Sequence, residues 1–231
     1  MTKIPTIEEM LKAGMHFGHR TSKWHPKMAP YIYGEKNEVY VIDLSRAREL
    51  LIEAVEFMKK SSGEGKVILF VGTKMQAKKI LRKAAEDAGM PYVDGKWLGG
   101  MVTNFNIIKK LIKNYKDLLE NKKSGKLEKY TKKEQVEFDR EIARLEVKVG
   151  GLVSLNKIPD IIFIWDVKKE KTAFAEAKKK GITVIGVCDT NTNPSGVDYV
   201  IPANDDATKT IKLILELAAE AVKEGKEITK K

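Results

Sequence analysis

Several features are scarce or missing in this 231-residue sequence, and each absence excludes a class of protein. The chain has one cysteine, Cys188, which excludes an internal disulfide and any zinc site built from several cysteines. No apolar run approaches the roughly 20 residues that a membrane-spanning helix needs. The N-terminal residues include Glu8 and Glu9 and lack the apolar centre of a secretory signal. We therefore expect a cytoplasmic protein with no membrane partner.

The fingerprints of nucleotide-binding enzymes are missing as well. An apolar run at residues 67–71 is typical of a buried strand, and Gly72-Thr73-Lys74 follows it before a helical pattern. Backbone N–H groups at such a turn bind anions, so Lys74 is a candidate phosphate contact. The turn has neither the G-x-x-x-x-G-K-[ST] spacing nor G-x-G-x-x-G. We therefore keep a nucleotide- or phosphate-ester-handling enzyme only as an alternative hypothesis for the function of the protein.

The strand expected at residues 182–187 leads into Cys188 and Asp189, at the edge where open α/β sheets bind ligands. A nucleophilic Cys188 would need a histidine, and the only histidines lie near the N-terminus, so we interpret it as a small buried hydrophobe. Asp189, Asp205 and Asp206 could gather around a cation. They could equally brace a turn and cap the last helix.

Positive charge dominates what is present. Lysine and arginine number 43 against 32 acidic residues, which gives a net charge of +11 and an isoelectric point near 9.4. Such a surplus attracts polyanions, of which nucleic acid is the commonest. Lysine outnumbers arginine 37 to 6, and with abundant glutamate this composition also fits a thermophile surface. The position of the charge is therefore more informative than its total.

Residues 11–34, which we call the basic N-terminal segment, contain no Asp or Glu, although the chain average predicts about three. Its cations are Lys12, Arg20, Lys23 and Lys27. Its aromatic residues are Phe17, Trp24, Tyr31 and Tyr33. Cations interleaved with aromatic rings are typical of surfaces that bind single-stranded or irregular RNA, although such rings also pack in cores.

All three histidines of the chain lie in this segment. His16 and His19 are three residues apart, and His25 could complete a three-nitrogen zinc shell, but no cysteine or carboxylate accompanies them. A catalytic histidine would find only Thr21 and Ser22 nearby. We expect neither metal nor cofactor, and we expect His16 and His19, with Trp24, to shape or stack against RNA.

Strand and helix patterns alternate through most of the chain. Apolar or β-branched runs predict strands at residues 39–42, 67–71, 91–93, 161–165, 182–187 and 199–201. Helical patterns lie between them and close the chain at residues 205–223. This rhythm predicts a doubly wound, mainly parallel sheet of about five strands with helices on both faces. We assign this domain to residues 37–103 and 153–224, with residues 1–36 packed on it and a polar tail at 225–231.

One segment, residues 104–152, interrupts the rhythm. It has no strand pattern, and its apolar residues step by three and four on each side of a polar turn. The spacing predicts an inserted antiparallel coiled-coil hairpin that projects from the domain. Its turn carries six lysines that could contact a large polyanion, namely Lys122, Lys123, Lys126, Lys129, Lys132 and Lys133.

Seven blocks of the sequence together resemble one known family. In chain order they are GMHFGHRTSKWHPKMAPYIYG, VYVIDL, FVGTKMQA, WLGGMVTNF, TKKE, KIPDIIFIWD and GVCDTNTNPSGVDYVIPANDDATKTI. In content and order they are similar to the second protein of the small ribosomal subunit in its bacterial form, over about residues 10–221. The chain departs mildly from the family at His25, where asparagine is usual, at Ala203 and at Thr208-Lys209.

The resemblance implies a flavodoxin-like fold and a structural role rather than catalysis. It implies binding to small-subunit ribosomal RNA and to neighbouring small-subunit proteins, including ribosomal protein one, whose docking supports translation initiation. On this reading the protein is located on the ribosome, is not a homo-oligomer and has no small-molecule substrate. Lys12, Arg20, Lys23, Lys27, Lys74 and the turn lysines would then contact RNA.

Overall fold

The computed structural model describes residues 2–228 and contains a five-stranded, fully parallel sheet. Its strands are β4 (Ile68–Val71), β5 (Tyr92–Val93), β6 (Ile161–Ile164), β7 (Thr183–Cys188) and β8 (Tyr199–Pro202). The spatial order is β5-β4-β6-β7-β8, which is the flavodoxin-like order 2-1-3-4-5. The predicted fold class is therefore confirmed.

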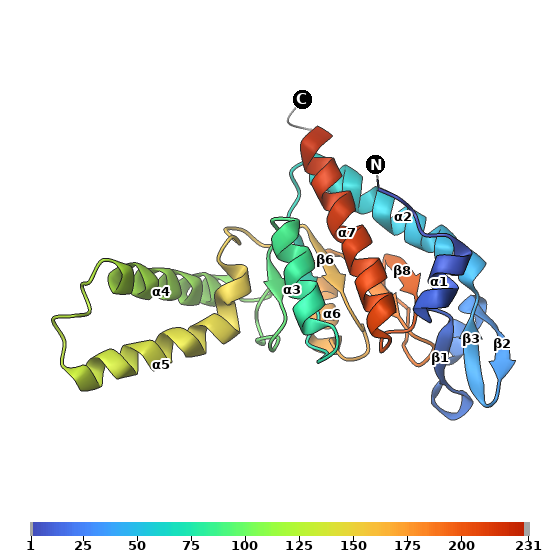
Figure 1. The fold of residues 1–231 in the computed structure, drawn as a ribbon, viewed down its shortest axis with the longest axis horizontal. Coiled ribbons are helices and arrows are strands. Elements are labelled where there is room, and N and C mark those ends of the chain that lie inside the picture. Colours follow the sequence, from blue (N-terminus) through green and yellow to red (C-terminus); the bar gives the residue numbers. More distant parts are fainter. Residues whose placement is uncertain (1, 229–231) are drawn as a thin grey trace.

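Helices cover both faces of this sheet (Figure 1). One face packs against α2 (Leu44–Gly63), α3 (Lys78–Asp87) and α7 (Thr208–Ile228), with α1 (Ile7–Ala13) against α2 and α7. The other face packs against α6 (Lys171–Lys179) and the base of the helical hairpin. Alternate residues of each central strand enter one core or the other, and this explains why their sequences are apolar throughout.

A second, three-stranded antiparallel sheet precedes the main one. It consists of β1 (Phe17–Arg20), β2 (Ile32–Lys36) and β3 (Val39–Ile42), in the order β1-β3-β2. Two 3₁₀ helices, η1 (Thr21–Lys23) and η2 (Pro26–Tyr31), connect β1 to β2. The expectation that residues 39–42 belong to the main sheet is therefore wrong. The two-residue turn at Asn37-Glu38 has positive φ at both positions, which folds β3 back onto β2.

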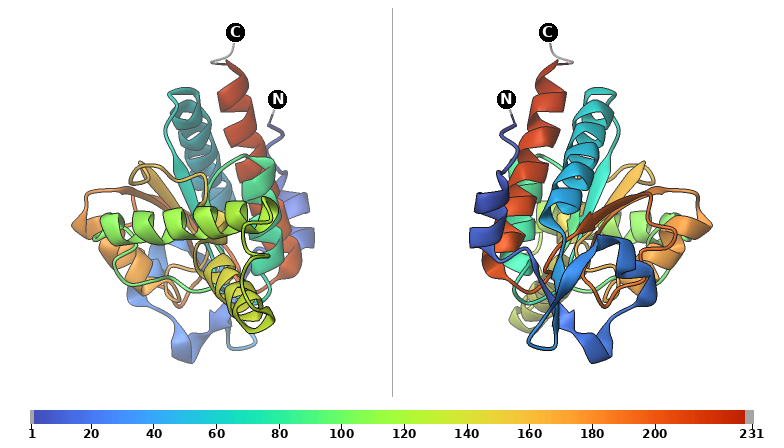
Figure 2. Two further views of the ribbon diagram at one scale, coloured as in Figure 1. Left: turned by 90° about the vertical axis from the view of Figure 1, so that its left-hand side faces the viewer. Right: turned by 90° about the vertical axis from the view of Figure 1, so that its right-hand side faces the viewer.

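The hairpin is formed by α4 (Phe105–Lys123) and α5 (Lys132–Val149), followed by η3 (Gly150–Leu152). It projects from the domain on the side opposite the small sheet (Figures 1 and 2). Ile108, Tyr115 and Leu145 are buried near its base, whereas Leu118 and Phe138 are only half-buried. The coiled-coil packing predicted along its whole length stays a prediction.

Residues 225–228, which we assign to a polar tail from the sequence, are instead the last residues of α7. Gly225 lies so close to α2 that a Cβ there would overlap the carbonyl oxygen of Lys59. Lys226 Nζ donates hydrogen bonds to the carbonyl oxygens of Ala88 and Gly89, just after α3. These tertiary contacts keep a polar sequence helical, and residues 229–231 lie outside the described part. Neither α7 nor any other helix between residues 2 and 228 is long and apolar enough to cross a membrane.

Candidate nucleic-acid interface

The basic N-terminal segment is held on the domain by its methionines. Met15 belongs to the core on one face of the main sheet and Met28 to the core on the other, and both are fully buried. Backbone N–H groups of His19 and His25 donate to the side chain and the carbonyl of Thr190, each at 2.8 Å. These contacts fix the segment across the carboxyl end of β7.

The four cations of this segment point to solvent. Lys12, Arg20, Lys23 and Lys27 are exposed, and none forms an ion pair with another residue in the described range 2–228. Apolar anchoring thus presents four unpaired positive charges on a backbone that is already ordered. Such an arrangement binds an anionic surface without first having to organise the loop.

The aromatic residues of the segment have two different roles. Trp24 is half-buried and its ring lies 5.0 Å from that of Tyr40, so it packs the loop against β3. Phe17 and Tyr33 remain 53% and 80% exposed. With Val39 and Val41 they line an open hollow of about 710 Å³ on the small sheet. This surface is apolar rather than basic.

The three histidines are not brought together as a metal site. The side chain of His25 accepts a hydrogen bond from the backbone of Lys27. His16 packs its ring 4.0 Å from that of Phe17, and partial burial lowers its pKa. Among the described residues His19 alone joins a cluster of possible ligands, with Asp205 and Asp206. The three-nitrogen shell, which the sequence left as an unfavoured alternative, has no counterpart among the described residues, because the cluster found there contains one histidine.

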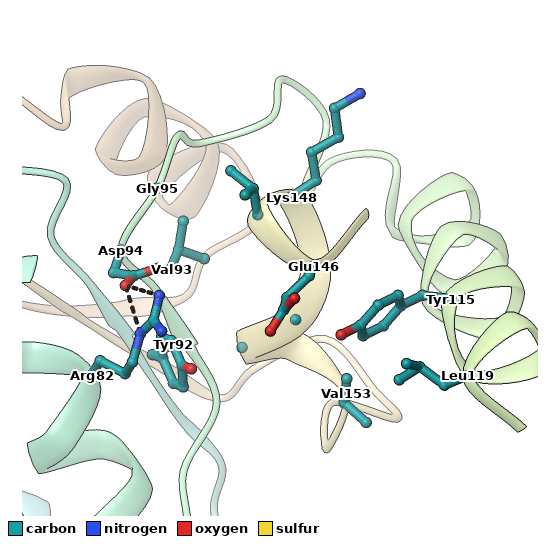
Figure 3. A pocket seen from close by; sticks show the side chains of 13 residues that line it. Arg82, Tyr92, Val93, Asp94, Gly95, Tyr115, Leu119, Glu146, Lys148 and Val153 are labelled. Carbon is teal, nitrogen blue, oxygen red and sulfur yellow. Dashed lines mark hydrogen bonds and ion pairs between the residues drawn. The ribbon is translucent and has the colours of Figure 1, made fainter. Parts of the chain in front are cut away.

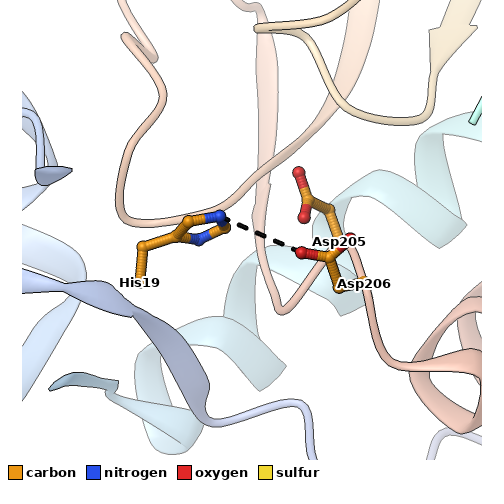
Figure 4. A group of neighbouring side chains, drawn as sticks. All are labelled: His19, Asp205 and Asp206. Atoms are coloured by element: carbon orange, nitrogen blue, oxygen red, sulfur yellow. Dashed lines mark ion pairs between the residues drawn. The ribbon is translucent and has the colours of Figure 1, made fainter.

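His19 contacts carboxylates at the carboxyl edge of the main sheet (Figure 4). Its Nδ1 lies 3.2 Å from Asp189, and its Nε2 lies 3.9 Å from Asp206. The carboxylate of Asp189 beside this ring raises the pKa of His19. Ligand atoms of His19, Asp205 and Asp206 lie within 4.8 Å of one another, a spacing that suits a divalent cation.

Lys74 supplies a positive charge to this cluster from within the protein. Its Nζ lies 2.7 Å from both Asp205 and Asp206 and 3.5 Å from Asp166. Burial disfavours the charged ammonium, but hydrogen bonds to Asp205 and Asp206 outweigh this and raise the pKa of Lys74. A metal ion would have to displace this ammonium from the carboxylates.

The groups of the Gly72-Thr73-Lys74 turn are already engaged within the fold, and the expected phosphate contact there stays a prediction. Lys74 is bound by carboxylates, and the backbone N–H and hydroxyl of Thr73 donate to Glu170 at 2.8 and 2.6 Å. A carboxylate of the chain itself thus occupies the anion-binding turn. The sequence could not show this, because Glu170, Asp205 and Asp206 are distant from the turn along the chain.

The lysines of the hairpin turn lie at the surface, and their predicted contact with a polyanion stays a prediction. All six are exposed, namely Lys122, Lys123, Lys126, Lys129, Lys132 and Lys133. Lys122 pairs with Asp139 across the hairpin at 2.8 Å, and Lys129 lies 5.4 Å from the ring centre of Tyr130. The remaining four have no ion pair with any residue from 2 to 228.

A small cavity lies where the hairpin joins the domain (Figure 3). Tyr92 of β5 and Tyr115 of α4 line it, and Arg82 beside it pairs with Asp94 at 2.8 Å. Its volume of about 170 Å³ is below the roughly 300–1,000 Å³ typical of cofactor sites. It is therefore a packing feature of the junction.

Glu176 of α6 is a buried residue that the sequence reading missed. Its carboxylate accepts hydrogen bonds from the indole of Trp97, the hydroxyl of Thr103 and the backbone N–H groups of Gly100, Val102 and Thr103. Burial alone would raise its pKa, but these donors lower it. Glu176 thereby orders the loop that leads into α4. Only its place on the inner face of α6 could have marked it.

Two comparisons with known proteins agree with this description. A family model described as Ribosomal protein S2 matches residues 10–225. A curated relative, Small ribosomal subunit protein uS2 of Coprothermobacter proteolyticus, is 48% identical over 224 residues. This alignment covers 97% of this chain and 84% of the relative.

Proposed function

This chain belongs to the ribosomal protein S2 family of the small ribosomal subunit, and from that premise we propose that it holds small-subunit ribosomal RNA through two separate basic surfaces. The family consists of structural ribosomal proteins rather than enzymes, so its partners are ribosomal RNA and other ribosomal proteins. Its place is the cytoplasmic ribosome. The observation that carries the proposal is the set of unpaired cations on the ordered basic N-terminal segment.

The first surface is this segment. Lys12, Arg20, Lys23 and Lys27 neutralise phosphates, and each contact releases a counterion. His19 and Trp24 contact Asp189 and Tyr40 within the protein, so their main role is to position the cations. His16 and the open edge of Trp24 add polar and stacking contacts where the RNA comes close.

The second surface is the lysine-bearing turn of the hairpin. It lies at the far end of the molecule from the small sheet (Figure 1). The two surfaces therefore contact different parts of the RNA, and the protein acts as a brace between them. This role needs one copy of the chain in each particle and no homo-oligomer.

A third surface suits a neighbouring protein. The hollow around Phe17 and Tyr33 exposes large rings, and its two charged lining residues, Glu35 and Lys36, are opposite in sign. This surface fits apolar side chains of a partner better than phosphates. We assign the docking of ribosomal protein one, and through it the support of translation initiation, to this face of the small sheet.

The arrangement also argues against the alternative enzyme. The ligand-binding edge of a doubly wound sheet lies at the carboxyl ends of its strands. Here the basic N-terminal segment is bonded to Thr190 at this edge, and Glu170 fills the turn after β4. A nucleotide would have to displace both.

The test is a triple substitution, Arg20→Ala with Lys23→Ala and Lys27→Ala. Salt dependence of RNA binding should weaken by about two to three in the log–log slope, since each cation contributes about 0.7–0.9. Co-sedimentation with small subunits in cell extract should fall, while thermal unfolding changes little because all three side chains are exposed.

The matched control replaces three exposed lysines beside and on α6, Lys168, Lys171 and Lys180, with alanine. It removes the same charge from another surface and should bind nearly as well as the native protein. Undiminished association of the triple variant would show that the basic N-terminal segment is not an RNA contact.

A further inference from the structure

A second basic feature of the hairpin lies on α4, away from its turn. An open hollow of about 590 Å³ runs along this helix beside residues 155–156. Its lining residues are Asn106, Lys109, Lys110, Ile112, Lys113, Lys116, Asp117, Leu155 and Asn156. We call this the α4 groove. All four of its lysines are exposed.

The lining of the α4 groove carries a net positive charge, because four lysines face a single acidic residue, Asp117. None of its four lysines forms an ion pair within residues 2–228. Lys113 is also three or four residues from each of the other three, a spacing at which like charges repel and destabilise a helix. An anionic ligand would turn this cost into binding energy.

We propose that the α4 groove binds the phosphodiester backbone of a base-paired segment of ribosomal RNA. The proposal rests on the proposed function and deepens it by adding a third RNA-binding site to the basic N-terminal segment and the hairpin turn. Lys109 and Lys116 are seven residues apart, about 10 Å along the helix, so the row reaches several phosphates in succession. A single small anion would use only part of it.

The lining also selects the form of the RNA. None of the residues of the α4 groove is aromatic, so it offers no surface on which unpaired bases can stack. The amides of Asn106 and Asn156 can donate to phosphates or contact 2′-hydroxyl groups. Backbone contacts without stacking are typical of proteins that bind double-stranded RNA by shape.

The test replaces Lys109, Lys110, Lys113 and Lys116 together with glutamine, which keeps the stems and removes the charge. Binding to protein-free small-subunit ribosomal RNA is measured over a series of salt concentrations. We expect the log–log slope to fall by about three and affinity near 0.15 M salt to drop at least roughly 30-fold. Thermal stability should be unchanged or higher, because repulsion within α4 is removed.

The control replaces Lys168, Lys171, Lys179 and Lys180, all exposed, with glutamine. This control variant has the same net charge as the α4 variant. Its log–log slope of RNA affinity against salt concentration should differ from that of the native protein by less than about one. An independent readout uses Asn106→Cys, since native Cys188 is completely buried and leaves the new thiol as the reactive one. A hydroxyl-radical-generating iron chelate attached there should cleave base-paired RNA in reconstituted particles.

The outcomes separate the two levels of the proposal. If the native protein binds the RNA but the α4 variant binds with the same affinity and slope, the α4 groove is not an RNA site, and the proposed function stands. If the iron chelate attached to Asn106→Cys cuts no RNA, the α4 groove is likewise not an RNA site, and the proposed function stands. Normal RNA binding with loss of the variant from assembled particles would assign the groove to an acidic protein instead. Failure of the native protein to bind RNA would refute the proposed function itself.

Discussion

Glu176→Ala should destabilise this protein more than any exposed substitution, because one buried carboxylate accepts five hydrogen bonds. Two of the donors, the indole of Trp97 and the backbone N–H of Val102, are themselves buried. Each buried donor that is left unsatisfied costs about 1–3 kcal/mol. The other three lie where water can replace the carboxylate. The expected loss is therefore about 2–6 kcal/mol, a large part of the roughly 5–15 kcal/mol that stabilises a typical domain.

The assay is urea unfolding at several pH values, with Glu137→Ala as the control. Glu137 is exposed on α5 and makes no ion pair with a described residue, so its loss should change stability by less than about 0.5 kcal/mol. The folded protein lowers the pKa of Glu176 below the ordinary value of 4.5. Its stabilising contribution is therefore complete above pH 4.5 and is lost as the pH falls through the folded-state pKa.

The difference between native protein and Glu176→Ala should accordingly be full at neutral pH and shrink in acid. Two results would refute the reasoning. One is a loss below about 1 kcal/mol at neutral pH, which would mean that water satisfies all five donors. The other is a difference that stays constant down to pH 3, which would mean that the charge of the carboxylate is irrelevant.

Two further predictions concern single residues. The folded state raises the pKa of His19 above 6.5, so the stability that its charge contributes is complete below pH 6.5 and is lost as the pH rises through the folded-state pKa. His19→Gln should remove this fall in stability above pH 6.5, and a pH profile of unfolding identical to the native one would contradict the prediction. Gly225→Ala should reduce the free energy of unfolding by about 1–3 kcal/mol and so lower the melting temperature, because the new methyl group overlaps the Lys59 carbonyl. Helix propensity alone predicts the opposite sign, so a rise in melting temperature would contradict the structure.

Strand and helix patterning predicted the main domain well, because its strands are buried on both faces and read as unbroken apolar runs. The small sheet was missed for a local reason. Its turn, Asn37-Glu38, lacks the glycine that usually marks such a hairpin, so residues 39–42 were placed in the wrong sheet. The tail prediction failed because the contacts of Gly225 and Lys226 are with α2 and residues 88–89, which periodicity along one helix does not report.

The candidate site divides in the same way. The absence of acid in residues 11–34 identified the exposed cations, since a net charge on a short segment is a property of composition. The sequence could not show which polar groups are already paired with other residues of the fold. Lys74 resembled a free phosphate contact and is held by Asp205 and Asp206, more than 130 residues away along the chain. Glu176 gave only one signal, its place beside Ala173 and Ala177 on the inner face of α6, and its hydrogen-bond partners in the loop before α4 could not be read from the sequence.

The sequence by itself determined the family, the α/β rhythm and the position of the positive charge, because these depend on residue order and local periodicity. Tertiary structure alone decided which charges are free. A cation is available to RNA only if no carboxylate reaches it, and chain segments that meet in space settle that question. Arg20 and Lys113 face solvent and have no ion pair with any residue of the described range, whereas Lys74 is paired with Asp205 and Asp206 within the fold.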